Sequence, residues 1–363
     1  MSLKDSNILF FTRTMELGGT ENVILQLCEI FQKQVNKIIV CSSGGVNVEK
    51  LDKMGIKHYA IDDVENKSPK VILSTVKKIK KIVRDEEIDI IHTHHRMAAF
   101  YVALAGLHKK CLFINTSHNT FQNRRFFTRF AFKHAKLVTC GEMVKKNITE
   151  YFGIKSEKVE VITNAVKPFT DDIVEEKMIK DCKMNGDVVI GNIGRLSEQK
   201  GMEYYVKAVP NVIKKHPNVK FFVIGEGEDR KKLEALISDL DIKENVFLLG
   251  YRTDVQNLMS QLDFVVLSSL WEGFPLTPIE AFSVGKTVIA TAVDGTVEIV
   301  SDKVNGLLIE PANVDEISNK IVYLIEHNKV LKEMEDNAKK TYEEKLSFDV
   351  FAKHYIQFYE ENM

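Results

Sequence analysis

The chain alternates short apolar runs of strand length with stretches of helical periodicity, and this alternation occurs twice. The first series of predicted strands covers residues 7–12, 37–41, 88–92, 112–116, 136–139 and 159–162. The second series covers residues 188–192, 220–224, 246–249, 264–267 and 287–291. Strands separated by helical patterns of about 10–15 residues form βαβ units and a parallel sheet. The sequence therefore predicts an α/β protein with two doubly wound, Rossmann-like domains.

A polar and acidic segment over residues 168–185 separates the two series. At roughly 100–200 residues per domain, a chain of 363 residues has room for both sheets. In open parallel sheets, ligands bind beyond the carboxyl ends of the strands. The cleft that two such domains are expected to form is therefore the predicted active site.

The net charge of −1 hides an asymmetry between the two halves of the chain. Residues 1–167 carry 27 Lys and Arg against 17 Asp and Glu, whereas residues 168–363 carry 23 against 34. A basic half of this kind favours an anionic partner, and nucleic acid, anionic lipid and a phosphorylated substrate all qualify. Much of the positive charge lies in segments 67–84 and 124–136.

The second basic segment, 124–136, also carries four aromatic side chains between its cations. Such a basic amphipathic helix suits a membrane interface. The alternative is an ordinary surface helix whose aromatic side chains face the core. The aromatic side chains are Phe126, Phe127, Phe130 and Phe132.

Several protein classes are disfavoured. No apolar run approaches the ~18 residues of a membrane span, and the N-terminus lacks the pattern of a signal peptide. The five cysteines are scattered without a CxxC pair, which fits a cytoplasmic protein and offers no zinc site. A metal site at His92, His94 and His95 is disfavoured because no Cys or carboxylate follows at matching spacing. Histidines at a buried strand end are more often simply hydrogen-bonded.

The first strand of each series is followed by one glycine-containing loop. Gly18 and Gly19 precede a helix, where a backbone without side chains can approach a phosphate. Arg195 and Lys200 share the loop after residues 188–192. Two cations in one strand-to-helix loop suit a diphosphate, because Arg bridges oxygens and Lys adds a point charge. Each motif taken alone is also compatible with an ordinary turn or a solvated loop.

A third motif places two glutamates eight residues apart. Glu272 precedes Gly273 and the segment 274–276, whose backbone N–H groups would open a helix and form another phosphate cradle. Glu280 lies on that helix, and ionised carboxylates bind sugar hydroxyls well. His118, at the end of a first-domain strand, would face the cleft.

Together, these motifs resemble the retaining glycosyltransferases of family 4, which have the GT-B fold of two Rossmann-like domains facing across a cleft. They are Gly-Gly-Thr-Glu at 18–21, Gly-Arg to Lys-Gly at 194–201, Glu-Gly-Phe-Pro-Leu to Glu at 272–280, and Gly295 to Glu298. The resemblance covers nearly the whole chain. One departure is Thr-Asn-Ala-Val at 163–166, where the family usually has Pro-Asn-Gly-Val. The resemblance implies domains at 1–166 plus 346–363, with a returning C-terminal helix, and at 167–345.

The resemblance also implies roles in binding a nucleotide-diphospho-sugar on the C-terminal domain. Arg195 and Lys200 would neutralise the diphosphate leaving group without a metal. Glu272 and the backbone N–H groups of Phe274 and Leu276 would hold the transferred sugar and the distal phosphate.

The resemblance implies further contacts with other parts of the donor. Glu280 would bind the ribose hydroxyls, and Gly19 would let its loop approach the diphosphate. His118 would contact the sugar near the anomeric centre. Gly225 and Tyr251 would flank the base.

The implied function is metal-independent sugar transfer with retention, the donor phosphate acting as base. A UDP-sugar is the favoured donor, and the acceptor would be a saccharide or a lipid pyrophosphate of capsule, exopolysaccharide or lipopolysaccharide synthesis. The enzyme would be cytoplasmic, with possible peripheral contact to an anionic membrane and no nucleic-acid partner. The alternatives are a nucleotide-sugar epimerase of the same architecture, a nucleic-acid or anionic-surface binding protein, and an inactive partner of another transferase.

Overall fold

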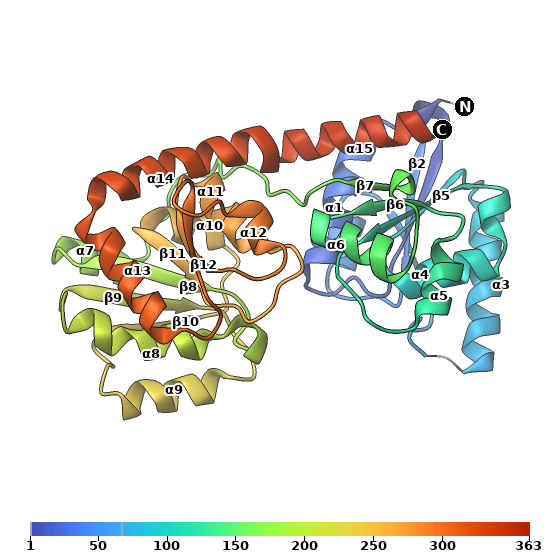
Figure 1. Ribbon diagram of the computed structural model, residues 1–363. Coiled ribbons are helices and arrows are strands. Elements are labelled where there is room, and N and C mark those ends of the chain that lie inside the picture. Colours follow the sequence, from blue (N-terminus) through green and yellow to red (C-terminus); the bar gives the residue numbers. More distant parts are fainter. Residues whose placement is uncertain (1, 67) are drawn as a thin grey trace. The chain divides into compact units, whose positions relative to one another are not determined.

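The computed structural model describes residues 2–66 and 68–363. The chain divides into two compact units (Figure 1). Unit 1 joins the residues up to Asn164 with Phe351–Met363, and unit 2 comprises Ala165–Val350. The sequence placed these divisions at 166/167 and 345/346. Met1 and Lys67, the first residue of the predicted basic segment 67–84, lie outside the described residues.

Unit 1 contains a parallel sheet of seven strands in the order β3-β2-β1-β4-β5-β6-β7. The central strand β1 is buried throughout, with Leu9 opposite Ile39 of β2 and Ile91 of β4. Burial on both faces explains its uninterrupted apolar run. The strands are β1 Asn7–Phe11, β2 Lys37–Ser42, β3 Lys57–Ala60, β4 Ile90–Thr93, β5 Leu112–Ser117, β6 Lys136–Thr139 and β7 Val159–Val161.

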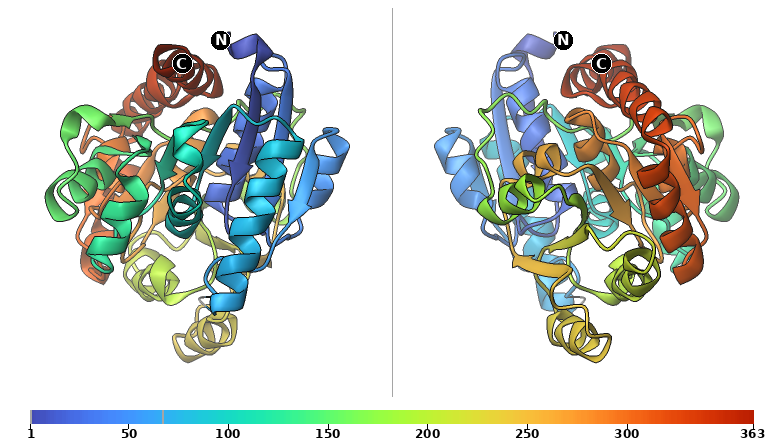
Figure 2. Two further views of the ribbon diagram at one scale, coloured as in Figure 1. Left: turned by 90° about the vertical axis from the view of Figure 1, so that its right-hand side faces the viewer. Right: turned by 90° about the vertical axis from the view of Figure 1, so that its left-hand side faces the viewer.

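Helices flank both faces of this sheet, as its reversal of strand order requires (Figure 2). The helix α3 illustrates how sequence sets a boundary. The Ser68 hydroxyl accepts a hydrogen bond from the Val71 N–H, and Pro69 occupies the first turn, where its missing N–H costs nothing. The helices are α1 Gly19–Phe31, α2 Val48–Lys53, α3 Pro69–Asp85, α4 Arg96–Leu104, α5 Arg125–Phe132 and α6 Glu142–Lys146.

Unit 2 repeats the architecture with six parallel strands in the order β10-β9-β8-β11-β12-β13. The strands are β8 Val188–Ile193, β9 Val219–Ile224, β10 Val246–Gly250, β11 Phe264–Leu267, β12 Val288–Thr291 and β13 Gly306–Ile309. The helices are α7 Lys177–Met184, α8 Met202–Ile213, α9 Arg230–Asp239, α10 Val255–Gln261, α11 Thr277–Ser283, α12 Thr296–Ile299, α13 Val314–Glu326, α14 Asn328–Thr341 and α15 Phe348–Asn362, of which α15 ends in unit 1.

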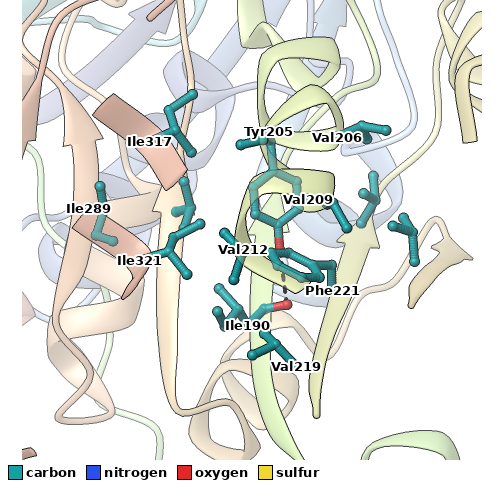
Figure 3. Packing of buried hydrophobic residues seen from close by; sticks show 14 of the residues in the cluster. Ile190, Tyr205, Val206, Val209, Val212, Val219, Phe221, Ile289, Ile317 and Ile321 are labelled. Carbon is teal, nitrogen blue, oxygen red and sulfur yellow. Dashed lines mark hydrogen bonds between the residues drawn. The ribbon is translucent and has the colours of Figure 1, made fainter. Parts of the chain in front are cut away.

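A buried hydrophobic cluster lies between α8, α13 and this sheet (Figure 3). Val209 and Val212 of α8 pack beside Phe221 of β9, and all three side chains are fully buried. Each such side chain contributes about 1.5–3 kcal/mol on burial. The Tyr205 hydroxyl, buried in the same cluster, donates to the Ile190 carbonyl at 3.0 Å. This core holds β8 and β9 rigidly, so the loops at their carboxyl ends start from fixed positions.

The basic aromatic segment forms the short helix α5, and its aromatic side chains face in different directions. Phe132 is buried, whereas Phe126, Phe127 and Phe130 are 87%, 59% and 46% exposed. The alternative in which these rings face the core therefore holds for Phe132 alone. Among residues 2–66 and 68–363, no helix has the length and apolar character needed to cross a membrane.

Candidate active site

In unit 2, the loop after β8 lies directly against the loop after β11. The Leu270 N–H donates to the Gln199 carbonyl at 2.8 Å, and the Ser268 hydroxyl donates to the Lys200 carbonyl at 3.1 Å. Gly201 has a φ of +55°, and a Cβ there would stand 2.2 Å from the Ser268 carbonyl oxygen. Only glycine permits this conformation and this approach together. The two loops are thus held together by a backbone hydrogen bond, by the Ser268 hydroxyl and by the close approach of Gly201 to the Ser268 carbonyl.

Lys200 and Glu272 form an ion pair across these two loops. The Nζ of Lys200 lies 2.5 Å from Oε1 of Glu272, and the side chains are only 20% and 7% exposed. The same carboxylate oxygen accepts a hydrogen bond from Ser269 at 2.7 Å. Because the pair is largely removed from water, its charges interact more strongly than those of a surface pair. The sequence predicted both members but gave no signal for Ser269.

Gly273 and the residues after it form the N-terminal side of α11. The Gly295 N–H donates to the Gly273 carbonyl at 3.1 Å, and a Cβ at residue 295 would lie 2.1 Å from that oxygen. The backbone N–H groups of Phe274 and Leu276 donate no hydrogen bond to any described residue. This geometry is compatible with the predicted phosphate cradle and leaves two donors available.

Glu280 follows on α11, close enough to Lys200 for their charges to interact. Burial raises the pKa of Glu280 to about 7, and the positive charge of Lys200 lowers it in part. No described residue donates a hydrogen bond to its carboxylate. A largely desolvated acceptor without a partner is suited to a ligand hydroxyl. Its predicted contact with ribose remains a prediction.

Arg195 differs from Lys200 although the two share a loop. Its side chain is 73% exposed, and its guanidinium lies 3.1 Å from the carboxylate of Glu228. Tyr251, just beyond β10, is also exposed, at 59%. The structure therefore brings Lys200 and Glu272 together. Arg195 is exposed and pairs with Glu228 rather than with Glu272. Glu228 was not anticipated from the sequence.

Gly225, predicted to lie beside the base, contacts the start of the Arg195 loop. A Cβ at residue 225 would stand 1.8 Å from the Gly194 carbonyl oxygen, and its φ is +149°. Its N–H donates to the Gly250 carbonyl at 2.9 Å. A side chain here would displace the loop backbone, so glycine is required by packing whether or not a base binds.

In unit 1, the carboxyl ends of β1, β4 and β5 surround a pocket of about 220 Å³. A Cβ at Gly18 would collide with the Glu21 carboxylate at 2.4 Å, whereas Gly19 has open space within 4 Å. A side chain at residue 18 would meet only the movable end of the Glu21 side chain, so the structure does not require glycine there, whereas a ligand could approach the backbone at Gly19. The pocket is lined by Thr12, Arg13, Thr14, Thr20, Glu21, His94, His95, Arg96, Thr116, Ser117, His118, Asn119 and Phe121.

The histidines of this region have separate roles. His92 is buried, with its ring nitrogens 2.7 Å from the hydroxyls of Tyr359 and Thr116, so it is the hydrogen-bonded core residue that the sequence favoured. His118 Nε2 lies 3.1 Å from His94 Nδ1, and burial lowers the pKa of His118 to about 4. His94 was considered only as a disfavoured metal ligand. Among the residues that the structure describes, no cluster of three or more His, Cys, Asp or Glu could hold a metal ion.

Comparison with solved structures identifies the architecture. The chain superposes on the Anabaena protein HepE in complex with UDP with a TM-score of 0.86, covering 98% of this chain and 100% of that one at 21% identity. Together with the two parallel doubly wound sheets, this similarity shows that the chain has the GT-B glycosyltransferase fold.

Comparison with protein families then identifies the family. A model described as "Glycosyltransferase Family 4" matches residues 17–168, and one described as "Glycosyl transferases group 1" matches residues 174–341. The chain belongs to the family-4 glycosyltransferases, as the motifs predicted.

Two curated relatives are similar in sequence. An uncharacterised glycosyltransferase of Methanocaldococcus jannaschii is 30% identical over 63% of this chain and 60% of the relative, so the match spans less than two thirds of that protein. The UDP-Gal:alpha-D-GlcNAc-diphosphoundecaprenol alpha-1,3-galactosyltransferase of Escherichia coli is 28% identical over 89% of this chain and 88% of the relative.

Proposed function

We propose that this protein transfers a sugar from a UDP-sugar to a saccharide or lipid-pyrophosphate acceptor, with retention of anomeric configuration and without a metal ion. The buried pair of Lys200 and Glu272 carries the proposal. A cation held at a strand end, beside available backbone N–H groups, is a fixed electrostatic site for a diphosphate. Fixed charges of this kind stabilise a leaving group as its negative charge grows.

The proposed division of labour follows from how each group is held. Lys200 is already positioned by Glu272, so it binds phosphate oxygens without reorganisation. Arg195 would exchange its exposed partner Glu228 for the diphosphate when the donor binds. The N–H groups of Phe274 and Leu276 add neutral donors, and Glu280 accepts from ribose hydroxyls. Glu272 binds the transferred sugar, and His118 contacts that sugar near its anomeric centre.

The choice of donor is supported by the comparisons. The Anabaena structure contains UDP, and the name of the Escherichia coli relative includes UDP-Gal. That name also specifies a diphosphoundecaprenol-linked acceptor. A lipid-linked step in capsule, exopolysaccharide or lipopolysaccharide assembly would agree with a basic unit 1 and with the exposed aromatic side chains of α5, which suit an anionic membrane surface.

The first experiment is a thermal-shift panel with UDP, GDP, ADP and their common sugars, with and without EDTA. A ligand at about 100 times its Kd stabilises the folded state by roughly 2.7 kcal/mol. We expect a shift with uridine nucleotides that EDTA does not change and that Lys200→Ala removes. The matched control is Lys207→Ala, which removes an exposed lysine from the neighbouring helix α8.

Product analysis distinguishes the remaining possibilities. Conversion of a UDP-sugar into a second UDP-sugar without acceptor would instead identify an epimerase. The absence of any nucleotide-dependent shift would reject the proposal. Tests with anionic vesicles and nucleic acid over a salt series would then follow, because binding to nucleic acid weakens steeply with salt.

A further inference from the structure

A second pocket of unit 1 lies at the opposite edge of the sheet from the pocket beside Gly19. Its volume of about 390 Å³ falls within the roughly 300–1,000 Å³ of small-molecule pockets. Its walls come from the end of α5 and from the loop before β7, so it lies at the amino ends of β6 and β7. None of the donor contacts proposed above involves it. The lining residues are Arg129, Phe130, Phe132, Lys133, Gly153, Ile154, Lys155 and Lys158.

This pocket concentrates positive charge. Four of its eight lining residues are Lys or Arg, and none of the described lining residues is acidic. Arg129, Lys133 and Lys158 form no ion pair with any residue that the structure describes. Lys155 lies 3.5 Å from Glu157, but both side chains are mostly exposed, at 76% and 69%, and exposed pairs contribute little. Because like charges around one cavity repel each other, an anion from outside the chain would stabilise this arrangement.

A turn at Gly153 brings the backbone close to these cations. Gly153 has a φ of +67°, and a Cβ there would lie 3.8 Å from a guanidinium nitrogen of Arg129 and 4.0 Å from one of Arg125. The Gly153 N–H donates no hydrogen bond to the described part of the chain. Guanidinium groups and an available backbone N–H at one turn are donors that phosphate oxygens accept.

The apolar wall of the pocket continues into the exposed aromatic surface of α5. Phe132 is buried, whereas Phe130 is 46% exposed. The ring centroid of Phe130 lies 5.7 Å from that of Phe100, and the centroid of Phe127 lies at the same distance from Phe100. Phe130 therefore belongs both to the pocket and to an aromatic cluster that is open to solvent. Exposed apolar patches of this kind mark interaction sites.

A phosphate group attached to apolar chains would satisfy both parts of this surface. Its oxygens would accept from the fork of Arg129 and from the lysine ammonium groups, while the exposed rings of α5 would enter the interfacial region of a bilayer. A free phosphate or a sugar phosphate would leave those rings in water. A nucleic acid would favour cations spaced along a groove, whereas these cations surround one cavity.

We propose that this pocket binds the phosphate headgroup of an anionic glycerophospholipid and so docks unit 1 on a bilayer surface. The inference rests on the membrane contact of the proposed function and gives that contact a discrete site. It does not depend on which sugar is transferred. Since the headgroup binds at the amino ends of the strands, the pocket at their carboxyl ends stays open to substrate.

The test is cosedimentation of the full chain with vesicles of phosphatidylcholine, alone or mixed with phosphatidylglycerol. The pocket variant is Lys133→Gln with Lys158→Gln, which removes one cation from each wall. The matched control, Lys33→Gln with Lys50→Gln, removes the same charge from exposed residues of unit 1. These control lysines precede β2 and β3, at the other end of the strand order from β6 and β7.

We expect the pocket variant to bind mixed vesicles about 30-fold more weakly, because each lysine at an anionic surface contributes about fivefold. The control variant should change by less than about threefold, since its lysines lie away from the headgroup. Neither variant should bind pure phosphatidylcholine better than the wild type. Both should keep the thermal shift with uridine nucleotides, which also verifies that they fold.

A second measurement separates a lipid headgroup from a free anion. ¹H–¹⁵N spectra follow the backbone amides of Gly153 and Ile154 during titration with dihexanoyl phosphatidylglycerol below its micelle concentration, or with inorganic phosphate. In the wild type, the short-chain lipid should shift these amides at concentrations at least about tenfold lower than phosphate, since its chains also bury apolar surface. In the pocket variant, neither ligand should shift them.

The opposing results are equally specific. Equal weakening in the two double variants would mean that net charge alone holds the protein at the membrane, and would overturn the inference. An equal response to phosphate and to the short-chain lipid would identify a soluble anion as the ligand, and shifts at lower concentrations of single-stranded RNA would identify nucleic acid. Either result would reject the lipid site. Vesicle binding by a wild type that neither binds nor uses a nucleotide-sugar would instead reject the proposed transfer and leave this site standing.

Discussion

The two units present opposite kinds of polar site at the carboxyl ends of their sheets. In unit 2, the buried charges are already paired, with Lys200 and Ser269 both bound to Glu272. In unit 1, the buried polar groups are neutral rings, and His94 and His118 each leave one nitrogen unsatisfied. Under the proposed function, a cation already held in place suits the diphosphate of the donor, whereas neutral imidazole rings add no charge to the site. Under the proposed function, this contrast assigns the charged contacts with the diphosphate to unit 2.

The largest effect is expected when the charge pair of unit 2 is broken. Lys200→Ala would leave the carboxylate of Glu272 buried with only Ser269 as a side-chain donor. We expect a loss of stability of about 2–4 kcal/mol and a fall in transfer rate of at least about 10³-fold, because a fixed cation is also lost. Urea denaturation and initial rates measure the two effects.

A double variant separates stability from chemistry in this pair. Lys200→Met combined with Glu272→Gln removes both charges, so stability should largely return while transfer does not. Transfer within tenfold of wild type in Lys200→Ala would contradict the assigned role and erase the contrast between the units.

Arg195 tests whether exposed charge in unit 2 acts only through the ligand. Its side chain is 73% exposed and its partner Glu228 is 57% exposed, so Arg195→Ala should change stability by no more than about 0.5 kcal/mol. We expect transfer to fall about 10²-fold, since one diphosphate contact is lost. Glu228→Ala is the control and should keep full activity. A large change in Tm with unchanged kinetics would show that the ion pair is structural.

Glu280 is the exception in unit 2, an acidic group without a hydrogen-bond partner. Its folded-state pKa is raised to about 7, so the stability that its protonated form provides is complete below about pH 4 and is lost as pH rises through 7. Glu280→Gln cannot ionise. Its stability relative to wild type should therefore rise by about 1–3 kcal/mol between pH 5 and pH 8.

Thermal unfolding of both proteins over this pH range measures the difference. Glu360→Gln, at an exposed residue of α15, should show no such trend. A constant difference between Glu280→Gln and wild type across the range would mean that the carboxylate ionises freely in the folded protein.

The sequence predicted the central strands and the edge strands β7 and β10, but it missed the edge strands β3 and β13. The edge strand β3 is partly exposed and polar, Lys-His-Tyr-Ala, so it has no apolar run to detect. The other missed strand, β13, is also an edge strand. Because β13 is apolar and mostly buried, exposure explains only why β3 was missed.

Site residues were predictable when their chemistry is encoded locally. Lys200 and Glu272 occur in loops directly after strands, so their convergence follows from the topology. Ser269, Glu228 and His94 were missed because their roles depend on partners brought close by the tertiary fold. His94, for example, contacts His118 from a neighbouring strand 24 residues away. Whether a buried nitrogen has a hydrogen-bond partner depends on the tertiary fold and cannot be inferred from the local sequence.

The smallest expected effect concerns the charge contrast between the units, at helix α5 of unit 1. Phe126 and Phe127 are exposed beside Arg125 and Arg129, an arrangement that suits an anionic bilayer. Phe126→Ser with Phe127→Ser should weaken binding to vesicles rich in phosphatidylglycerol by about tenfold. Transfer to a soluble acceptor should stay unchanged. Tyr323→Ser, which alters an exposed aromatic residue of unit 2, is the control for cosedimentation. Equal binding by all variants would show that the two phenylalanine rings do not contribute to vesicle binding.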